Sequence, residues 1–157
     1  MRPIALTSSH IEEFWALRSA LLSELGELPG GGEAQTFEEA SRVYFLSHIG
    51  RDLFCWGIPA EDGLAACGSL CLFERLPYPG NPAGREGYLL NVYTRPEFRG
   101  KGYATRILEE MIRFAGKNGI GRLWLSASDM GRPLYRRAGF SDRENEMELF
   151  LPPAKTD

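Results

Sequence analysis

The chain has 157 residues, of which 43% are hydrophobic and 25% charged, and its formal net charge is −3. These values favour one globular domain, which we expect to span residues 1–157. The weakly acidic balance excludes a global basic field of the kind that attracts nucleic acid or an anionic membrane, so any anion site must be local. No apolar run is long enough for a signal peptide or for a membrane span of ~20 residues, which predicts a cytoplasmic protein.

The sequence has three cysteines, Cys55, Cys67 and Cys71, at spacings that are not typical of metal sites. Cys67 and Cys71 would share one face of a strand, which is poor geometry for a disulfide, so we expect buried, reduced thiols. The two histidines do not cluster with these cysteines, and we therefore predict no metal site.

The first half of the chain predicts two helices between strands. The capping box Ser9-x-x-Glu12 predicts a helix that Gly26 ends, and the glycine-rich loop 26–35 separates it from a helix behind a second box, Thr36-x-x-Glu39. The predicted strands here cover residues 3–7, 52–60 and 63–76. Asp62-Gly63 favours a hairpin between the last two.

The second half contains a strand–helix–strand unit. An apolar strand over 87–94 precedes an amphipathic helix that runs to about residue 118, and a strand over 122–128 follows. We expect these two strands to be parallel neighbours. A short helix, RPLYRRA, and a final alternating strand over 146–151 complete the order β-α-α-β-β-β-α-β-α-β, an α/β fold.

The stretch RPEFRGKGYATRIL, residues 95–108, places Gly100 and Gly102 at the first turn of the central helix. Glycine there costs up to ~1 kcal/mol relative to alanine. The first amides of a helix have no internal partner and, together with the helix dipole, favour a phosphate. Glycines let the phosphate approach the backbone, and Arg99 and Lys101 add positive charge. The turn therefore predicts an anion cradle.

Two common phosphate-binding motifs do not fit this turn. The P-loop requires Ser or Thr after its Gly-Lys pair, but here Gly102 follows Lys101. The dinucleotide motif G-x-G-x-x-G requires a third glycine, but Thr105 stands at that position.

A third pattern does fit. Arg99-x-x-Gly102-x-Ala104 resembles the [QR]-x-x-G-x-[GA] motif of the GCN5-related N-acetyltransferase (GNAT) superfamily, and Leu134-Tyr135-x-x-x-Gly139-Phe140 resembles its Y-x-x-x-G-F element. The likeness is close over residues 87–140 and extends to the rest through topology. It implies a mixed, mostly antiparallel central sheet with helices on both faces, as in small bacterial-type members of unassigned substrate.

The resemblance implies acetyl-CoA as cosubstrate. Its pyrophosphate would lie on the amides of residues 100–105, and its pantetheine arm would run along the strand that ends at Thr94, where the family has a parting between the two parallel strands. Ser128 stands where relatives often have a coenzyme-contacting asparagine, although capping of the following helix is an equal alternative. The cofactor-binding candidates are Val92, Tyr93, Thr94, Arg99, Gly100, Lys101, Gly102, Tyr103, Ala104, Thr105 and Ser128.

The same resemblance suggests catalytic residues. Tyr135 matches the family's tyrosine acid, whose phenol can protonate a leaving thiolate, and the amide of Val92 is the candidate oxyanion donor. Many relatives have a glutamate where this chain has Tyr88. Glu86 lies two residues earlier on the same face and is our candidate base, acting through water. Two alternatives remain: Glu86 as a solvated loop carboxylate, and proton loss to bulk water without a base.

The predicted activity is acetyl transfer from acetyl-CoA to an amine of a small molecule or peptide. Partners would be that amine and a second copy in a homodimer, with no nucleic acid and no membrane. One alternative is a non-catalytic acyl-CoA-binding regulatory module, and another is a nucleotide-binding protein that uses the same turn.

Overall fold

The computed structural model describes residues 1–154, which contain a five-stranded sheet in the order β1-β2-β3-β4-β5. The pairs β1–β2, β2–β3 and β3–β4 are antiparallel, and β4 pairs with β5 in parallel. The strands are β1 (Ile4–Ala5), β2 (Leu53–Ala60), β3 (Gly63–Glu74), β4 (Arg85–Thr94) and β5 (Arg122–Leu125). This mixed, mostly antiparallel sheet and the parallel β4–β5 neighbours confirm the predictions.

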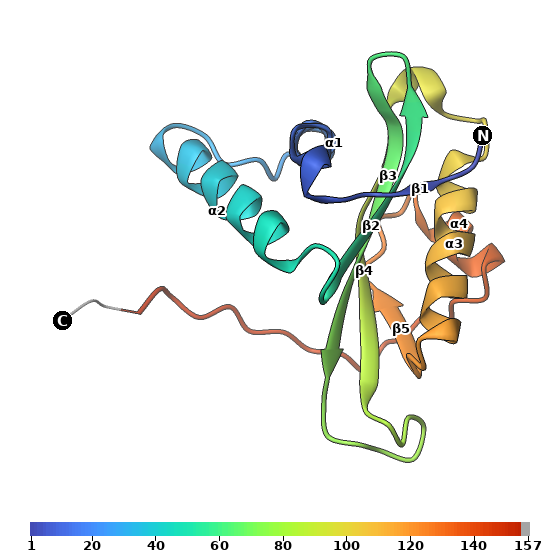
Figure 1. The fold of residues 1–157 in the computed structure, drawn as a ribbon. Coiled ribbons are helices and arrows are strands. Elements are labelled where there is room, and N and C mark those ends of the chain that lie inside the picture. The colour runs from blue at the N-terminus through green and yellow to red at the C-terminus, as the bar shows by residue number, and fades with distance from the viewer. Residues whose placement is uncertain (155–157) are drawn as a thin grey trace.

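Helices cover both faces of the sheet (Figure 1). One side has α1 (Ile11–Glu24) and α2 (Gly32–His48), and the other has α3 (Tyr103–Lys117) and α4 (Arg132–Arg137). The alternation of side chains along β2 explains the two layers, because Cys55 packs with Phe14 and Phe45 whereas Ile58 packs with Ile107 and other residues of α3. Each face of the sheet therefore has its own apolar core.

The strand β4 changes its pairing halfway along, which creates the parting that the resemblance implied. Its ladder with β5 ends at Leu89–Leu125, so the last five residues of β4 lack a β5 partner. On its other edge the register with β3 shifts, because Leu90 pairs with Ser69 but Tyr93 pairs with Cys67. Asn91, at the shift, has a φ of 56°, a value that bulged positions adopt. The strands β4 and β5 thus separate just before the glycine turn.

Both predicted capping boxes are wrong. Thr7 and His10 form the box of a 3₁₀ turn, Ser8–His10, and α1 begins after it. The second helix begins at Gly32, so Thr36 lies inside it and the glycine-rich loop is shorter than expected. The β2–β3 hairpin is confirmed, with Ala60 paired to Gly63 across the turn.

The predicted final strand over 146–151 is also wrong in this structure. Residues 141–154 form no strand, and their backbone makes no hydrogen bond within the described part of the chain. In Figure 1 this C-terminal segment crosses the sheet and leaves it on the side of α2. Alternation predicted an amphipathic strand, but a strand also needs a partner edge, and none pairs with it here.

Across residues 1–154, no helix is long and apolar enough to cross a membrane. Within the same range, no group of three or more His, Cys, Asp or Glu residues could hold a metal ion. The cysteines are free thiols in β2 and β3, and all three lie on the side of α1.

Candidate active site

The first turn of α3 presents a run of free amides. No amide from Gly100 to Thr105 has a hydrogen-bond acceptor among the described residues, and the first bond of the helix joins the Arg106 N–H to the Gly102 carbonyl. Gly100 and Gly102 have φ values of 77° and 75°, in the left-handed region that glycine tolerates. A Cβ on either would meet nothing within 4 Å, so the space above these amides is open. This geometry fits an anion such as a pyrophosphate.

Arg99 ties the glycine turn to two neighbours. Its Nε donates to the Thr94 carbonyl at 3.0 Å, and its Nη2 contacts both carboxylate oxygens of Glu24 in α1 at 2.8 Å. The hydrogen bonds to Glu24 raise the pKa of Arg99, which therefore stays charged. Lys101 is exposed, with its ammonium 5.1 Å from the Phe98 ring. Arg99 thus fixes the turn, and Lys101 supplies charge at its rim.

The unpaired end of β4 supplies further polar groups next to this turn. Asn91 Oδ1 and Thr94 Oγ1 are buried and have no hydrogen-bond partner within residues 1–154. Buried polar atoms without partners are uncommon, so they indicate a ligand or water contact. Asn91 and Val92 also lack a partner residue on β3. The edge of β4 beyond Leu89, which has no β5 partner, fits the amide groups of a pantetheine arm, which can add to it as a strand would.

The other candidates around the turn differ in exposure. Tyr93 is buried on the α1 side, so only its main chain is free for a coenzyme. Tyr103 packs against the α3-side core, Ala104 is half-buried and Thr105 is exposed. The turn therefore offers mainly backbone to a ligand.

A cleft of about 1130 Å³ lies along β5 and α4. Tyr135 lines it together with Tyr88 and Trp124, whose rings meet edge-on at 4.6 Å. Burial raises the pKa of Tyr135, with a smaller contribution from Tyr88, so its phenol is protonated at neutral pH. The indole Nε1 of Trp124 is buried without an acceptor in the described chain. Tyr135 is thus a neutral phenol beside two other aromatic side chains of the cleft.

Glu86 is completely buried on β4, so the alternative of a solvated loop carboxylate is wrong. Arg122 donates to its Oε1 at 3.1 Å and the Tyr78 hydroxyl donates to its Oε2 at 2.8 Å, while Arg75 lies 3.5 Å from Oε2. Arg75 and Arg122 line the cleft, with Glu86 behind them. The base role stays a prediction, but this geometry favours an anchor for the two arginines.

Sequence reasoning missed these partners of Glu86. Arg122 stands opposite Glu86 in the β4–β5 register. Parallel pairing was predicted, but its register was not, and no local signal placed the loop residue Tyr78 against β4.

Ser128 follows β5 and precedes α4. Its Oγ accepts a hydrogen bond from the Gly131 amide at 3.1 Å, and its carbonyl accepts one from the Arg132 amide at 3.0 Å. Ser128 therefore closes the turn that leads into α4, whereas the N-cap residue of the helix itself is Gly131, which has no side-chain cap bond. A coenzyme contact by the same hydroxyl stays a prediction.

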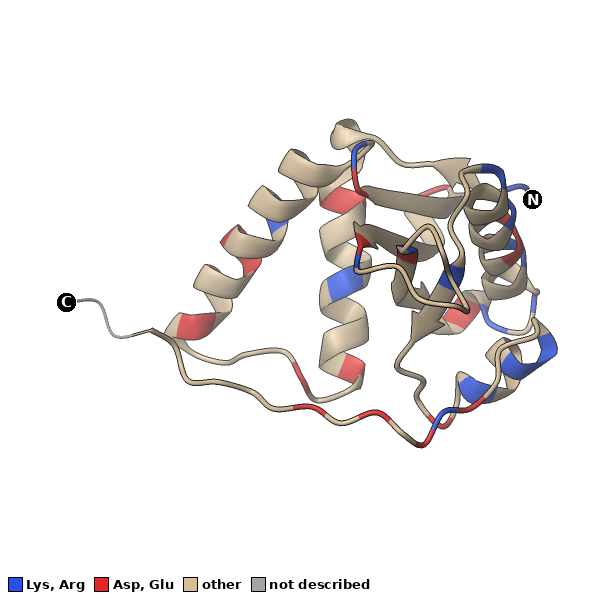
Figure 2. Cartoon of the chain, turned by 90° about the horizontal axis from the view of Figure 1, so that it is seen from below, with Lys and Arg blue, Asp and Glu red and all other residues tan. Residues whose placement is uncertain are grey.

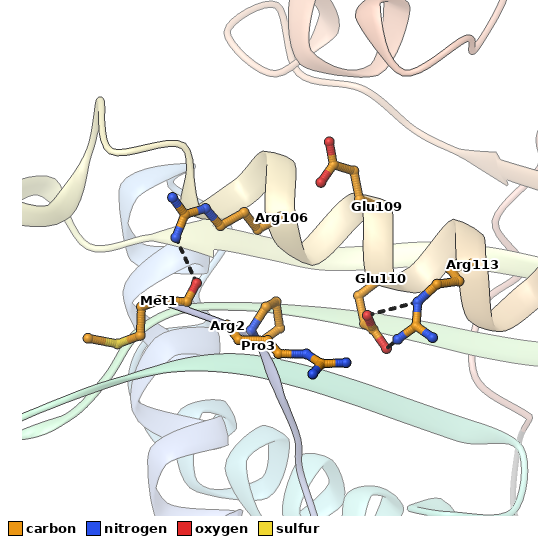
Figure 3. Close-up of a pocket in the computed structure, with 7 residues that line it drawn as sticks. All are labelled: Met1, Arg2, Pro3, Arg106, Glu109, Glu110 and Arg113. Carbon is orange, nitrogen blue, oxygen red and sulfur yellow. Dashed lines mark hydrogen bonds and ion pairs between the residues drawn. The ribbon is translucent and has the colours of Figure 1, made fainter.

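A second cavity, of about 530 Å³, lies where the N-terminus passes the outer face of α3 (Figure 3). Arg106 donates to the Met1 carbonyl at 2.8 Å, and Arg113 pairs with Glu110. The Arg106 bond holds the N-terminus against α3, and none of the predicted site residues lines this cavity.

Comparison with protein families supports the geometry. The model described as the acetyltransferase (GNAT) family matches residues 15–140. The chain belongs to this family. Every predicted site residue, from Glu86 to Tyr135, lies inside the match, whereas the C-terminal segment lies outside it. No curated protein matches the chain.

Solved structures show the same fold. A predicted acetyltransferase with acetyl-CoA from Clostridium acetobutylicum has a TM-score of 0.82 at 26% identity, over 95% of each chain. A GCN5-related N-acetyltransferase from Ralstonia eutropha has a TM-score of 0.83 at 25% identity, over 96% of this chain and 97% of that one. Glucosamine-6-phosphate N-acetyltransferase from Arabidopsis thaliana has a TM-score of 0.70 at 21% identity, over 96% of this chain and 98% of that one. At this identity the likeness shows a shared fold alone.

As a GNAT protein, the chain is an acetyl-CoA-dependent acyltransferase. Family membership therefore favours an enzyme over a non-catalytic module, and coenzyme A over another nucleotide at the glycine turn.

Proposed function

We propose that this chain transfers an acetyl group from acetyl-CoA to an amine of a small molecule or peptide by direct attack on the thioester. The observation that carries the proposal is the coincidence of the free α3 amides, the parted β4 edge and Tyr135 in one region of the fold. Acetyl-CoA supplies the activated acyl group, and the chain's own residues bind it and manage the protons.

Coenzyme binding rests on the backbone. The amides of Gly100 to Thr105 receive the pyrophosphate, and Lys101 adds charge at the rim. The main-chain groups of Val92 and Thr94 bind the pantetheine arm. Ser128 contributes a hydroxyl at the start of α4. Because backbone groups provide most of these contacts, affinity depends on local conformation more than on side-chain identity.

Two groups act on the reaction. The amide of Val92, beside the shift in β4 register, donates to the carbonyl oxygen as negative charge develops there. Tyr135 holds its proton at neutral pH because burial raises its pKa, and gives that proton to the departing sulfur.

The amine must lose a proton before it attacks, since an alkyl ammonium has a pKa of about 10.4. Glu86 has no exposed surface and its oxygens are engaged by Arg122 and Tyr78, which favours loss of the proton to water. Glu86 then contributes by fixing the arginines of the cleft. The cytoplasm is the expected compartment, and a homodimer the expected assembly.

The proposal is tested by release of free coenzyme A from acetyl-CoA over a panel of polyamines, amino acids, aminoglycosides and peptide N-termini. Amine-dependent release, with acetylated product identified by mass spectrometry, is the expected result. Calorimetric binding of acetyl-CoA without turnover on any amine would instead support a binding module. Absence of both would refute the cradle and the proposed activity together.

A further inference from the structure

Arg18 of α1 is a half-buried cation without a partner. Within residues 1–154 it makes no hydrogen bond and no ion pair. The other half-buried arginines in this range each have a hydrogen-bond partner: Arg42, Arg85, Arg95, Arg122 and Arg132. Burial lowers the pKa of Arg18, but a guanidinium keeps its charge in proteins. Because withdrawing a charge from water without a counter-charge costs free energy, this cation indicates a ligand contact.

Arg18 projects into the space between α1, α2 and the sheet. The helix α1 lies between α2 and the sheet in both views of the fold (Figures 1 and 2). The Arg18 guanidinium lies 5.7 Å from the centre of the Phe37 ring of α2. On the side of the sheet it faces thiols, of which Cys71 of β3 acts most strongly on its charge, ahead of Cys67 and Cys55. Burial raises the pKa of all three thiols, so none of them offers a negative charge at neutral pH.

A row of side chains leads from Arg18 to the active-site cleft. Cys71 pairs with Tyr88 of β4, and Tyr88 pairs with Trp124 of β5, so these three side chains lie on the same face of the sheet. Cys71 packs against the α1-side core, which identifies that face. Tyr88 and Trp124 line the cleft, where Tyr88 contributes to the raised pKa of Tyr135. The α1 face of the sheet is therefore continuous with the cleft that contains the proposed acid.

A second polar group on this face also lacks a partner. Asn91 Oδ1 is buried and accepts no hydrogen bond within the described residues. The Asn91 Nδ2 lies 3.7 Å from the Cys67 sulfur, which places the side chain on the α1 side with Arg18. Asn91 also precedes Val92, whose amide is the proposed oxyanion donor. The α1 face thus offers a fixed cation and, beside the reaction centre, a free acceptor for an amine N–H.

We propose that the acceptor is an amine that also carries an oxyanion group, a carboxylate or a phosphate, and that Arg18 binds this group. The acceptor class belongs to the acetyl transfer proposed above and rests on that function. The planar fork of arginine donates two parallel hydrogen bonds to a carboxylate or phosphate, so it selects such acceptors over neutral amines. Arg18 determines specificity in this arrangement and takes no part in moving the acetyl group or a proton.

The test compares matched amines at saturating acetyl-CoA: free amino acids with their amides, and O-phosphoethanolamine with ethanolamine. The best anionic amine should exceed its neutral counterpart in kcat/KM by at least about tenfold. Arg18→Met keeps a long apolar stem beside Phe37 and removes the charge. It should raise the KM of the anionic amine about ten- to a hundredfold with little change in kcat, and leave the neutral amine unaffected. Arg18→Lys should recover part of the loss.

Arg42→Met is the matched control. Arg42 is half-buried in α2 and lies over the Trp15 ring, but it is paired with Glu12 and Glu38. Its substitution should leave the KM of the anionic amine unchanged. Arg18→Met should keep or raise Tm, because it removes a half-buried charge that has no partner. A lower Tm together with an unchanged KM would assign Arg18 a structural role and overturn the proposal.

The outcomes separate the role of Arg18 from the proposed function. Equal turnover of neutral and anionic amines would keep acetyl transfer and overturn the role of Arg18. If no amine is acetylated, the proposed activity fails, and calorimetry of the same amines on protein saturated with free coenzyme A still decides the binding role. An anionic amine that binds the wild type and not Arg18→Met supports it, whereas equal binding by both proteins, or binding by neither, overturns it. Preference between the amino acids and O-phosphoethanolamine identifies which oxyanion the acceptor carries.

Discussion

Replacing Glu86 with glutamine separates its two proposed roles, as a general base and as an anchor for the arginines of the cleft. The substitution keeps the shape of the side chain and removes its charge. The carboxylate is fully buried between the Arg122 guanidinium at 3.1 Å and the Tyr78 hydroxyl at 2.8 Å. Arg122 is itself 18% exposed, so little water is available to replace the lost charge.

The loss of stability can be bounded from these contacts. Removing one member of a buried ion pair costs about 3–5 kcal/mol because the other charge is left behind. Two features reduce this cost: the glutamine carbonyl still accepts one hydrogen bond, and Glu146 still pairs with Arg122 at 3.0 Å. We therefore expect a loss of about 3 kcal/mol, which corresponds to a fall in Tm of roughly 6–12 °C for a domain of this size.

The assay combines thermal unfolding with steady-state kinetics below the unfolding transition. Glu146→Gln is the matched control, since it removes the half-exposed carboxylate on the same arginine and should cost less than about 1 kcal/mol. With proton loss to water, Glu86→Gln should retain kcat within a few-fold.

Two results would refute the anchoring role. A fall in kcat of about a hundredfold or more with little change in Tm is the signature of a general base. Equal losses of stability for Glu86→Gln and Glu146→Gln would show that the buried Glu86–Arg122 pair contributes no more to folding stability than the half-exposed Glu146–Arg122 pair.

Three further predictions concern the glycine turn, the acid and the thiols. Gly102→Glu should abolish acetyl-CoA binding in calorimetry, whereas Gly50→Glu, at a φ of 80° in equally open space, should bind normally; intact binding by the first variant would disprove the cradle. Tyr135→Phe should lower kcat about a hundredfold with unchanged coenzyme affinity. Burial raises the pKa of Tyr135, so any alkaline loss of activity that it causes should begin above about pH 10 and vanish in the variant; a wild-type rate would exclude the acid role. Burial also raises the pKa of the Cys55 thiol to about 12 and that of Cys67, so Ellman's reagent should react slowly with these two thiols in the native protein and with all three after unfolding; fast native labelling of more than the half-buried Cys71 would contradict their burial.

The region from β4 to α4 was predictable because its signals are local. Periodicity predicted α3 as an amphipathic helix, and its buried residues Ile107, Leu108, Met111 and Ala115 recur at helical spacing along one face. The cost of glycine at the first turn predicted an open backbone, and both glycines have the positive φ values that explain their presence. Here local propensity and the final fold agree, so a single sequence is informative.

Features that depend on distant pairing were not predictable in the same way. The burial of Glu86 depends on a β4–β5 register that brings Arg122 opposite it, and on a loop that carries Tyr78 inward. The start of α1 was misplaced because Ser9 and Thr7 are both good caps, and the bonds of Thr7 to His10 select Thr7 and put a 3₁₀ turn before α1. Such choices depend on contacts that spacing does not encode.

The C-terminal segment shows the same limit and suggests why the donor is easier to identify than the acceptor. Its alternation of apolar and polar residues is typical of a strand, but spacing along the chain supplies no partner edge on which that strand could form. The proposed coenzyme cradle is built from one continuous stretch, Arg99 to Thr105. The cleft that contains Tyr135 combines residues of α3, β4, β5, α4 and the segment after α4, so its shape depends on contacts between distant parts of the chain.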